Sequence, residues 1–226
     1  MLNPAYVQAL ALTLLVMVFS LTVHEFAHAY VAYRLGDDTA ARQGRLSLSP
    51  VSHVDPIGTL LIPAVSLYLG GIGLIGWARP VPVSPVRFSR KVSMRTGMAL
   101  VAVAGPVSNL LLAILSIAVY AIGDHTGTLL REPTGEFSAF GVLLVHLFHV
   151  NVALAIFNLL PIPPLDGSRL LPRSFDEWAQ RIAPVSFVLL LVLINTPQLR
   201  YYVLDAPFAF VAGALETVFR TQVAFR

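Results

Sequence analysis

The sequence contains no cysteine, and this absence limits the sites that the chain can build. Disulfide bridges and thiolate metal sites are both excluded, so any metal ion must be held by histidine, aspartate or glutamate side chains. Charged residues are also few, at 12% of the 226 residues, and the formal net charge is only +3. So small and scattered a charge does not form a nucleic-acid-binding surface, and no nucleic-acid partner is expected.

Hydrophobic residues dominate the rest of the composition. They make up 56% of the chain, and the mean hydropathy is +0.75, well beyond the apolar content of ordinary soluble domains. The sequence therefore predicts an integral membrane protein of the all-α class. The 16 prolines and 15 glycines lie inside and between the apolar runs rather than in a linker, which favours one compact domain with broken or re-entrant segments.

Six apolar runs are candidate membrane segments. They cover residues 5–23, 57–77, 97–122, 137–160, 184–194 and 206–219. The first is long enough for a hydrocarbon core of about 30 Å, and we expect it to be retained because it lacks the features of a removable signal peptide. The prediction is a polytopic bundle of about five spanning helices in a single domain, 1–226. Its core covers residues 5–170, and further membrane segments lie within residues 182–220.

Positive charge predicts which loops face the cytoplasm. Residues 77–95 carry five Lys or Arg side chains and no acid, whereas residues 123–136 are net acidic, so the positive-inside rule places the first loop in the cytoplasm. The ends of the first and fourth runs should then meet on that side, which requires that one run between them does not span. We expect residues 57–76 to be this re-entrant segment, because they are interrupted by Pro63, Gly70, Gly71, Gly73 and Gly76.

Several polar residues outside the main motifs are expected to have structural roles. Residues 45–49 alternate apolar and polar side chains and predict a short β element at the membrane surface. His53 and Asp55 follow in a loop, where a solvated histidine and a turn aspartate are favoured over residues that line a cleft. His146 and His149 on the fourth run are expected to hydrogen-bond to their neighbours, away from the first run.

The end of the first apolar run carries the polar stretch HEFAH, with His24, Glu25 and His28. Ionisable groups buried in a membrane helix are costly and are functional by default. The two histidines lie four residues apart and share one helix face, so both imidazoles can reach one tetrahedral Zn²⁺. Glu25 projects beside them, close enough to take a proton from a zinc-bound water. The alternative, histidines bonded to backbone and Glu25 paired with Arg34 or Arg42, is disfavoured because burying three ionisable groups together is expensive.

A catalytic zinc site needs a third protein ligand, and Asp166 in NLLPIPPLDG is the strongest candidate. The prolines before it prevent a regular helix, so the carboxylate can point inward from an extended segment. Spacing alone leaves an alternative open, in which Asp166 only caps the next helix through Gly167 and Ser168.

Three motifs together resemble the site-2 protease family of intramembrane zinc metalloproteases. They are HEFAH near the end of one membrane helix, AGPVSN at residues 104–109 opening another, and NLLPIPPLDG closing a third. The segments GRLSLSPVSHVDPIGT and WARPVPV look like the compact prokaryotic branch of that family, which lacks PDZ and CBS domains. The resemblance covers about residues 20–170, and Ser49 departs from the Asn of the family pattern, outside the metal motif.

The resemblance implies a role for each of five residues by position. His24, His28 and Asp166 would bind one zinc ion, and Glu25 would be the general base and then the proton donor. Asn158 would hold the substrate or polarise its carbonyl as an oxyanion donor, although an amide that satisfies carbonyls at the helix end is an equal alternative.

The function implied by the resemblance is hydrolysis of peptide bonds in or near transmembrane segments of membrane proteins. Its partners would be a transmembrane substrate and the lipid bilayer, and its location a prokaryotic plasma membrane with the active site toward the cytoplasm. Two other functions remain open. One is a divalent-metal transporter that uses the same His and Asp cluster, and the other is an inactive module that binds membrane peptides. Asn109, in AGPVSN, is expected only to hydrogen-bond between packed helices.

Overall fold

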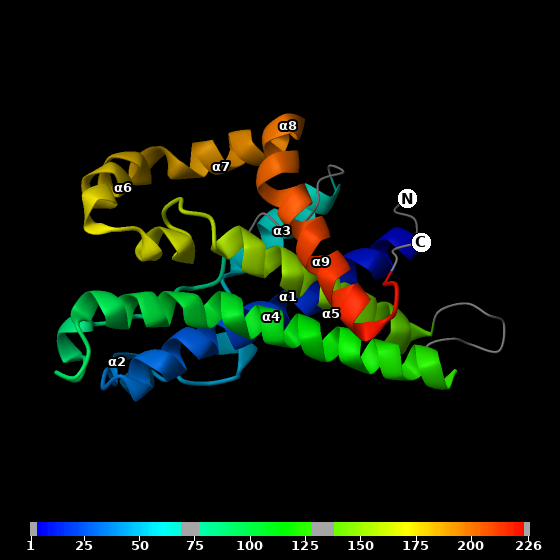
Figure 1. Ribbon diagram of the computed structural model, residues 1–226, viewed down its shortest axis with the longest axis horizontal. Helices are drawn as coiled ribbons and strands as arrows, with labels where there is room; N and C mark the ends of the chain where they lie inside the picture. The colour runs from blue at the N-terminus through cyan, green and yellow to red at the C-terminus, as the bar shows by residue number, and fades with distance from the viewer. Residues whose placement is uncertain (1–3, 69–76, 128–137, 224–226) are drawn as a thin grey trace.

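The computed structural model describes residues 4–68, 77–127 and 138–223. In these parts of the chain all regular structure is helical (Figure 1). Five helical stretches are long and apolar enough to cross a membrane, as the sequence predicted. They are Val7–Arg34, Met94–Thr126, Ala139–Asn158, Arg173–Asn195 and Pro197–Phe219.

Three long helices form the core of the bundle: α1 (Pro4–Arg34), α4 (Met94–Thr126) and α5 (Ala139–Asn158). In Figure 1 α4 and α5 run side by side in opposite directions, and α1 crosses behind them. Ile117 of α4 and Phe148 of α5 are fully buried in one cluster. Met17 of α1 packs with Leu154 of α5 in another. Close packing of this kind holds membrane helices together, because lipid supplies no hydrophobic driving force between them.

Sequence signals set the ends of the core helices. Ser93 caps α4 by accepting a hydrogen bond of 3.1 Å from the Thr96 amide. Ser138 caps α5 in the same way through the Gly141 amide, also at 3.1 Å. Such caps satisfy amides that have no partner within the helix. At the other end of α5 the proline run stops the helix, and the chain turns into the short helix η4 (Asp166–Leu170).

The C-terminal helices lie at the edge of this core. They are α6 (Asp176–Ile182), α7 (Ser186–Asn195), α8 (Pro197–Arg200) and α9 (Ala206–Phe219), with η5 (Arg173–Phe175), η6 (Ala183–Val185) and η7 (Tyr201–Asp205) between them. The most apolar stretches of the last two candidate spans are only 17% and 6% buried inside the protein, against 33–50% for the three core helices. Their apolar side chains therefore face outward, as expected for contact with lipid.

The segment between α1 and α4 contains the short helices α2 (Thr39–Arg42), η1 (Pro50–Ser52), η2 (Pro56–Leu61), α3 (Ile62–Tyr68) and η3 (Pro85–Arg87). The predicted re-entrant hairpin over residues 57–76 is not confirmed, since η2 and α3 form one continuous helical run and residues 69–76 lie outside the described residues. The residues at either end of this predicted hairpin are in contact, because the Trp77 amide donates to the Gly58 carbonyl at 3.1 Å.

The predicted short β element at residues 45–49 is also not confirmed, since these residues are described and form no strand. Alternation of side chains does not supply the neighbouring strand that a β-ladder requires. In this segment the hydrogen bonds involve side chains instead of a neighbouring strand. His53 Nε2 bonds to the Ser47 carbonyl at 2.7 Å, and the Arg45 guanidinium donates to the Arg79 carbonyl.

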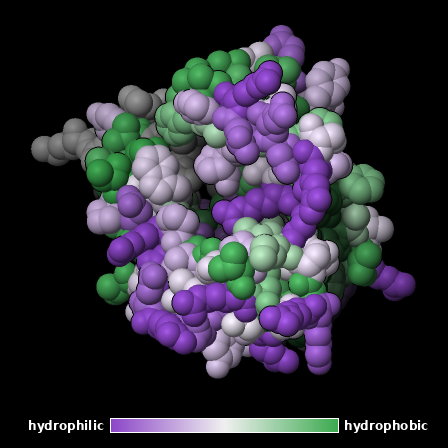
Figure 2. Space-filling view, turned by 90° about the vertical axis from the view of Figure 1, so that its left-hand side faces the viewer, coloured by the Kyte–Doolittle hydropathy of each residue, from purple (hydrophilic) through white to green (hydrophobic). Residues whose placement is uncertain are grey.

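One end of the molecule is polar. Figure 2 shows the end at which α2, the start of α4 and α6 lie, and hydrophilic side chains gather over much of its lower half. The C-terminal part of α1 and the loop after α5 both reach this end (Figure 1). The HEFAH and LDG motifs therefore lie close together toward the polar end of an apolar bundle.

Candidate metal centre

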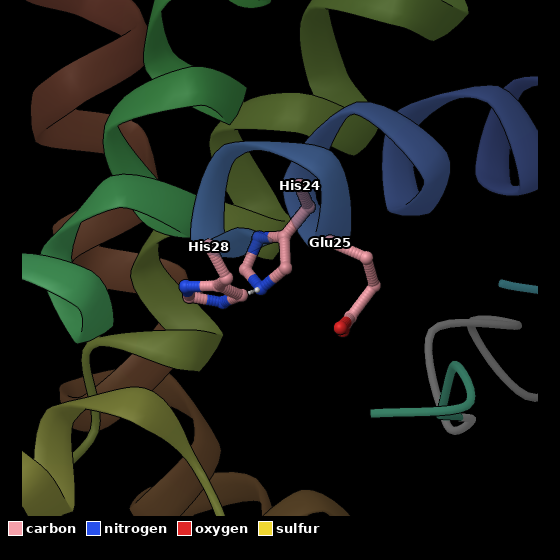
Figure 3. A group of neighbouring side chains, drawn as sticks. All are labelled: His24, Glu25 and His28. Atoms are coloured by element: carbon pink, nitrogen blue, oxygen red, sulfur yellow. Dashed lines mark hydrogen bonds between the residues drawn. The ribbon is translucent and has the colours of Figure 1, made fainter. Parts of the chain in front are cut away.

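Helix α1 presents His24, Glu25 and His28 toward one region of the interior. All three side chains are buried, and Figure 3 shows the two imidazoles facing each other with the Glu25 carboxylate extending beside them. The Nε2 atoms of His24 and His28 are 3.0 Å apart. The spacing of four residues produces this arrangement, because it places side chains one helical turn apart on the same face.

Asp166 reaches the same point from the loop after α5. Its Oδ2 lies 3.1 Å from His24 Nε2 and 3.2 Å from His28 Nε2. Gly167 is needed for this approach, since an added Cβ would overlap the carbonyl oxygen of Leu159. Burial alone would raise the pKa of the Asp166 carboxyl, but the imidazoles that face it, when they are protonated, lower that pKa below its usual value. The group is therefore a carboxylate at neutral pH.

The three converging atoms fit a zinc ion. Ligands about 2.0–2.1 Å from a tetrahedral zinc are separated by about 3.3 Å, close to the 3.0–3.2 Å found between the two Nε2 atoms and Oδ2. Asp166 Oδ2 is buried, and within the described parts of the chain it makes no hydrogen bond. The imidazoles use their other nitrogens elsewhere: His28 Nδ1 bonds to the Val101 carbonyl at 2.6 Å and His24 Nδ1 to Asn109 Oδ1 at 2.7 Å. One nitrogen from each ring and one carboxylate oxygen are thus available to a single cation.

Glu25 is the other acid near the two imidazoles. Potential ligand atoms of His24, Glu25 and His28 lie within 4.8 Å of one another, a looser arrangement than that of Asp166. Glu25 Oε2 accepts a hydrogen bond of 3.0 Å from the Val81 amide, which holds the carboxylate beside the histidines. Asp166 therefore fits the position of a third ligand better than Glu25, whose carboxylate lies beside the two imidazoles.

A cavity of about 280 Å³ opens on this cluster. Its polar lining includes Asn158 and Arg169 as well as the four residues just described. Its apolar lining comes from α1, α4, α5, residues 77–83 and the loop before Asp166. Asn158 thus lies in the same cavity as the histidines, at the end of α5. Its Nδ2 donates to the Leu154 carbonyl at 3.0 Å, so the structure contains the helix-end bond that was the alternative to an oxyanion role.

The remaining polar residues are placed as follows. Asp55 caps η2 by accepting from the Ile57 and Gly58 amides, as a turn aspartate should. His146 and His149 bond to carbonyls of their own helix α5. The prediction of a solvated His53 is wrong, because this side chain is only 1% exposed and bonds to backbone.

Some parts of the site were missed by sequence reasoning. The Val101 carbonyl and the Val81 amide are backbone groups, which nearly every residue type carries, so the sequence could not indicate that they contact the site. Gly105 packs directly on the histidines, because a Cβ at this position would lie 2.5 Å from His24 Cε1 and from His28 Nε2. The signal for it was present in the motif AGPVSN, where a glycine in a helix interior usually marks a close approach. Arg169 had no signal beyond its position three residues after Asp166.

Comparison with known proteins agrees with this chemistry. The model of peptidase family M50 matches residues 135–196. The "Putative zinc metalloprotease YwhC" of Bacillus subtilis is 42% identical over 187 residues, which cover 80% of this chain and 78% of that protein. The "Putative zinc metalloprotease Rip2" of Mycobacterium tuberculosis H37Rv is 35% identical over 199 residues, covering 86% of this chain and 71% of that protein.

A third relative, "Putative zinc metalloprotease Rip2" of Mycolicibacterium smegmatis, is 30% identical over 211 residues, covering 91% of this chain and 75% of that protein. No solved structure matches the chain significantly. Identity at this level over most of both partners, together with a buried His, His and Asp cluster in a bundle of apolar helices, shows that the chain belongs to peptidase family M50, the site-2 protease family, and is a zinc metallopeptidase.

Proposed function

We propose that this peptidase is an endopeptidase that cleaves membrane proteins in or near their transmembrane segments. One zinc ion would be held by His24, His28 and Asp166, and Glu25 would act as the general base. The observation that carries this proposal is the convergence of two imidazole nitrogens and one buried carboxylate oxygen within 3.2 Å. They face a cavity inside a helix bundle that is apolar enough to lie in a bilayer.

Within this site the residues of the chain would move one proton. When bound, zinc would lower the pKa of a water molecule and polarise the scissile carbonyl. Glu25 would take the proton of the attacking water and then deliver it to the leaving amide nitrogen. The Val81 amide, 3.0 Å from Glu25 Oε2, would keep the carboxylate in place while its charge changes.

Asn158 is proposed as a donor to the substrate carbonyl. Its amide lines the cavity that contains the histidines, and it would have to turn from the Leu154 carbonyl toward the substrate. An amide so placed could stabilise negative charge on the carbonyl oxygen as hydrolysis proceeds.

The position of the site supports a cytoplasmic active site. The five basic residues between Trp77 and Arg95 would keep that loop on the cytoplasmic side of a prokaryotic plasma membrane. Glu25 accepts from Val81 of this same loop. We also propose that residues 57–76 enter the bilayer and return, since the hydrogen bond between Gly58 and Trp77 joins the two ends of that segment. A single domain, 1–226, would then include both the site and the C-terminal helices.

Metal removal tests the proposal directly. Purified protein in detergent should cleave a single-span membrane substrate, and a chelator should abolish cleavage because the three ligands would have no cation to hold. Adding zinc back should restore cleavage, whereas added magnesium should not, since two imidazoles do not suit a hard cation. Cleavage that survives complete removal of zinc, checked by elemental analysis, would disprove a zinc mechanism.

Replacement of Asp166 by alanine should weaken zinc binding by more than about 100-fold. Loss of a hydrogen-bond partner of a metal ligand costs up to about that factor, and loss of a ligand itself should cost more. The variant removes the only carboxylate oxygen found within 3.2 Å of both Nε2 atoms in the described residues. Zinc affinity can be measured by competition with a chelating dye. Asp176→Ala is the matched control, because Asp176 is exposed and pairs only with Arg95 at the surface. If Asp166→Ala binds zinc as the control does, Asp166 is not a ligand.

A further inference from the structure

A chain of buried polar side chains runs behind His24, away from the cavity. Ser20 of α1, Asn109 of α4 and Asn151 of α5 are each 0% exposed. Each of the three core helices therefore contributes one polar residue to this cluster, at a depth where an unpaired polar group would be costly. His24 Nδ1 lies 2.7 Å from Asn109 Oδ1 and connects the cluster to the candidate metal ligands.

The donor and acceptor of each hydrogen bond among these buried side chains follow from one backbone carbonyl. Asn151 lies 2.8 Å from the Leu147 carbonyl, which can only accept, so the Asn151 amide nitrogen must face it. The Asn151 oxygen then faces Asn109 and accepts from its amide nitrogen at 2.8 Å. This leaves the Asn109 oxygen toward His24. Each amide can have only one orientation if both of its ends are to be satisfied.

Two further contacts agree with this assignment. The same amide nitrogen of Asn151 donates to Ser20 Oγ at 2.9 Å, and the amide nitrogen of Asn109 also lies 3.5 Å from the Ser20 carbonyl. If either amide were reversed, an oxygen would face a carbonyl oxygen at a fully buried position. The orientations of the two amides are thus fixed by main-chain acceptors, the Ser20 carbonyl on α1 and the Leu147 carbonyl on α5.

The consequence reaches the candidate metal site. Since Asn109 Oδ1 is an acceptor, His24 must carry its proton on Nδ1, and Nε2 of the neutral ring presents its lone pair toward His28 and Asp166. His28 obtains the same tautomer directly from the Val101 carbonyl at 2.6 Å. One histidine is therefore oriented by the main chain and the other by a relay of two amides.

We propose that Asn109 and Asn151 are positioning residues that set the tautomer and orientation of His24 for zinc. The inference rests on the proposed ligand role of His24. Asn109 acts on the imidazole directly, and Asn151 acts only through Asn109, whose amide it keeps from turning over. Outer partners of this kind typically change metal affinity by about 10–100-fold.

The experiment measures zinc affinity in the native protein, four variants and one control variant, all purified in detergent. Asn109→Ala should weaken zinc binding by about 10–100-fold. Asn109→Asp should restore only part of the affinity, because one carboxylate oxygen can accept from Nδ1 but the other would face the Asn151 oxygen. Asn151→Ala should weaken binding less. The double variant Asn109→Ala with Asn151→Ala should bind zinc no worse than Asn109→Ala alone, since residues that act in series are not additive. Asn195→Ala, which removes an exposed amide bonded to its own helix, should leave affinity unchanged.

A second measurement does not depend on any of the Asn variants folding. Nitrogen NMR of metal-free native protein labelled in histidine, with the His24 signals assigned by their loss in His24→Ala, reports which ring nitrogen carries the proton. The neutral ring of His24 should be protonated on Nδ1. Protonation on Nε2 would overturn the proposal, as would an Asn109→Ala protein that binds zinc within about twofold of native, against the 10–100-fold expected.

Additive losses in the double variant would also overturn the relay, because Asn151 would then act independently of Asn109. None of these results would contradict the proposed function, since native protein would still bind zinc and cleave its substrate. A native protein that binds no zinc at all would reject the ligand assignment, and the relay would be rejected with it.

Discussion

Glu25→Gln should abolish cleavage while zinc remains bound. Glutamine keeps the size of the side chain and an oxygen that can accept from the Val81 amide, now 3.0 Å from Glu25 Oε2, so the fold and the ligands should be unaffected. It lacks the basicity needed to take a proton from water. General base catalysis is worth about 10²–10⁴-fold, and cleavage of a single-span substrate should fall by at least that factor.

The control for this prediction is Glu177→Gln. Glu177 lies on α6, is 87% exposed and pairs with Arg181 at the surface, so its loss should change neither zinc content nor cleavage. Both variants are assayed for bound zinc by elemental analysis and for cleavage in detergent. Cleavage by Glu25→Gln within about tenfold of native, well above the loss expected of a missing base, would assign the proton transfer to another group. Loss of zinc from this variant would make Glu25 a ligand instead.

Gly105→Ala should weaken zinc binding sterically, without replacing any of the three proposed ligands. The added methyl carbon would lie 2.5 Å from His24 Cε1 and from His28 Nε2, so at least one imidazole must move. Overlap of this kind in a packed interior typically costs about 1–3 kcal/mol. The ligand atoms of a metal site must be held close to their binding geometry. We therefore expect zinc affinity to fall by at least the 10–100-fold that is typical when a hydrogen-bond partner of a metal ligand is lost, and cleavage to fall with it.

Gly213→Ala provides a matched comparison. Gly213 also lies inside an apolar helix, α9, and a Cβ there would meet nothing within 4 Å. Alanine should leave zinc and cleavage unchanged and, since it is the better helix former by up to about 1 kcal/mol, should not lower stability. Thermal unfolding and zinc titration of both variants separate the steric effect from a general effect of glycine replacement. Equal zinc affinities in the two would show that the imidazoles accommodate a methyl group.

The number of long helices was predictable, but their bounds were less so. The first apolar run covers residues 5–23 and its helix was expected to extend through HEFAH, but α1 continues further, to Arg34. The fifth run was expected over residues 184–194, whereas the helical stretch begins at Arg173. Hydropathy measures only the apolar part of a helix, and polar turns at either end remain helical because their backbone is satisfied in the same way.

The sequence pattern predicted the short elements between α1 and α4 less well than the long helices. A proline and several glycines suggested a hairpin at residues 57–76. The residues described there, up to Tyr68, are helical, and because residues 69–76 lie outside the described residues the hairpin stays a prediction. Alternation at residues 45–49 suggested a strand, but the Ser47 carbonyl is satisfied by the His53 side chain instead. A strand depends on a partner that only the tertiary structure supplies.

The sequence by itself determined the class of this protein, its membrane helices and the residue types of its site. The spacing of His24 and His28 placed two imidazoles on one helix face, because helix geometry is local. Only the tertiary structure decided that Asp166 meets them, that Val81 holds Glu25 and that Asn109 bonds to His24. These contacts join residues far apart in the chain, and the packing of α1 against α4 and α5 creates them.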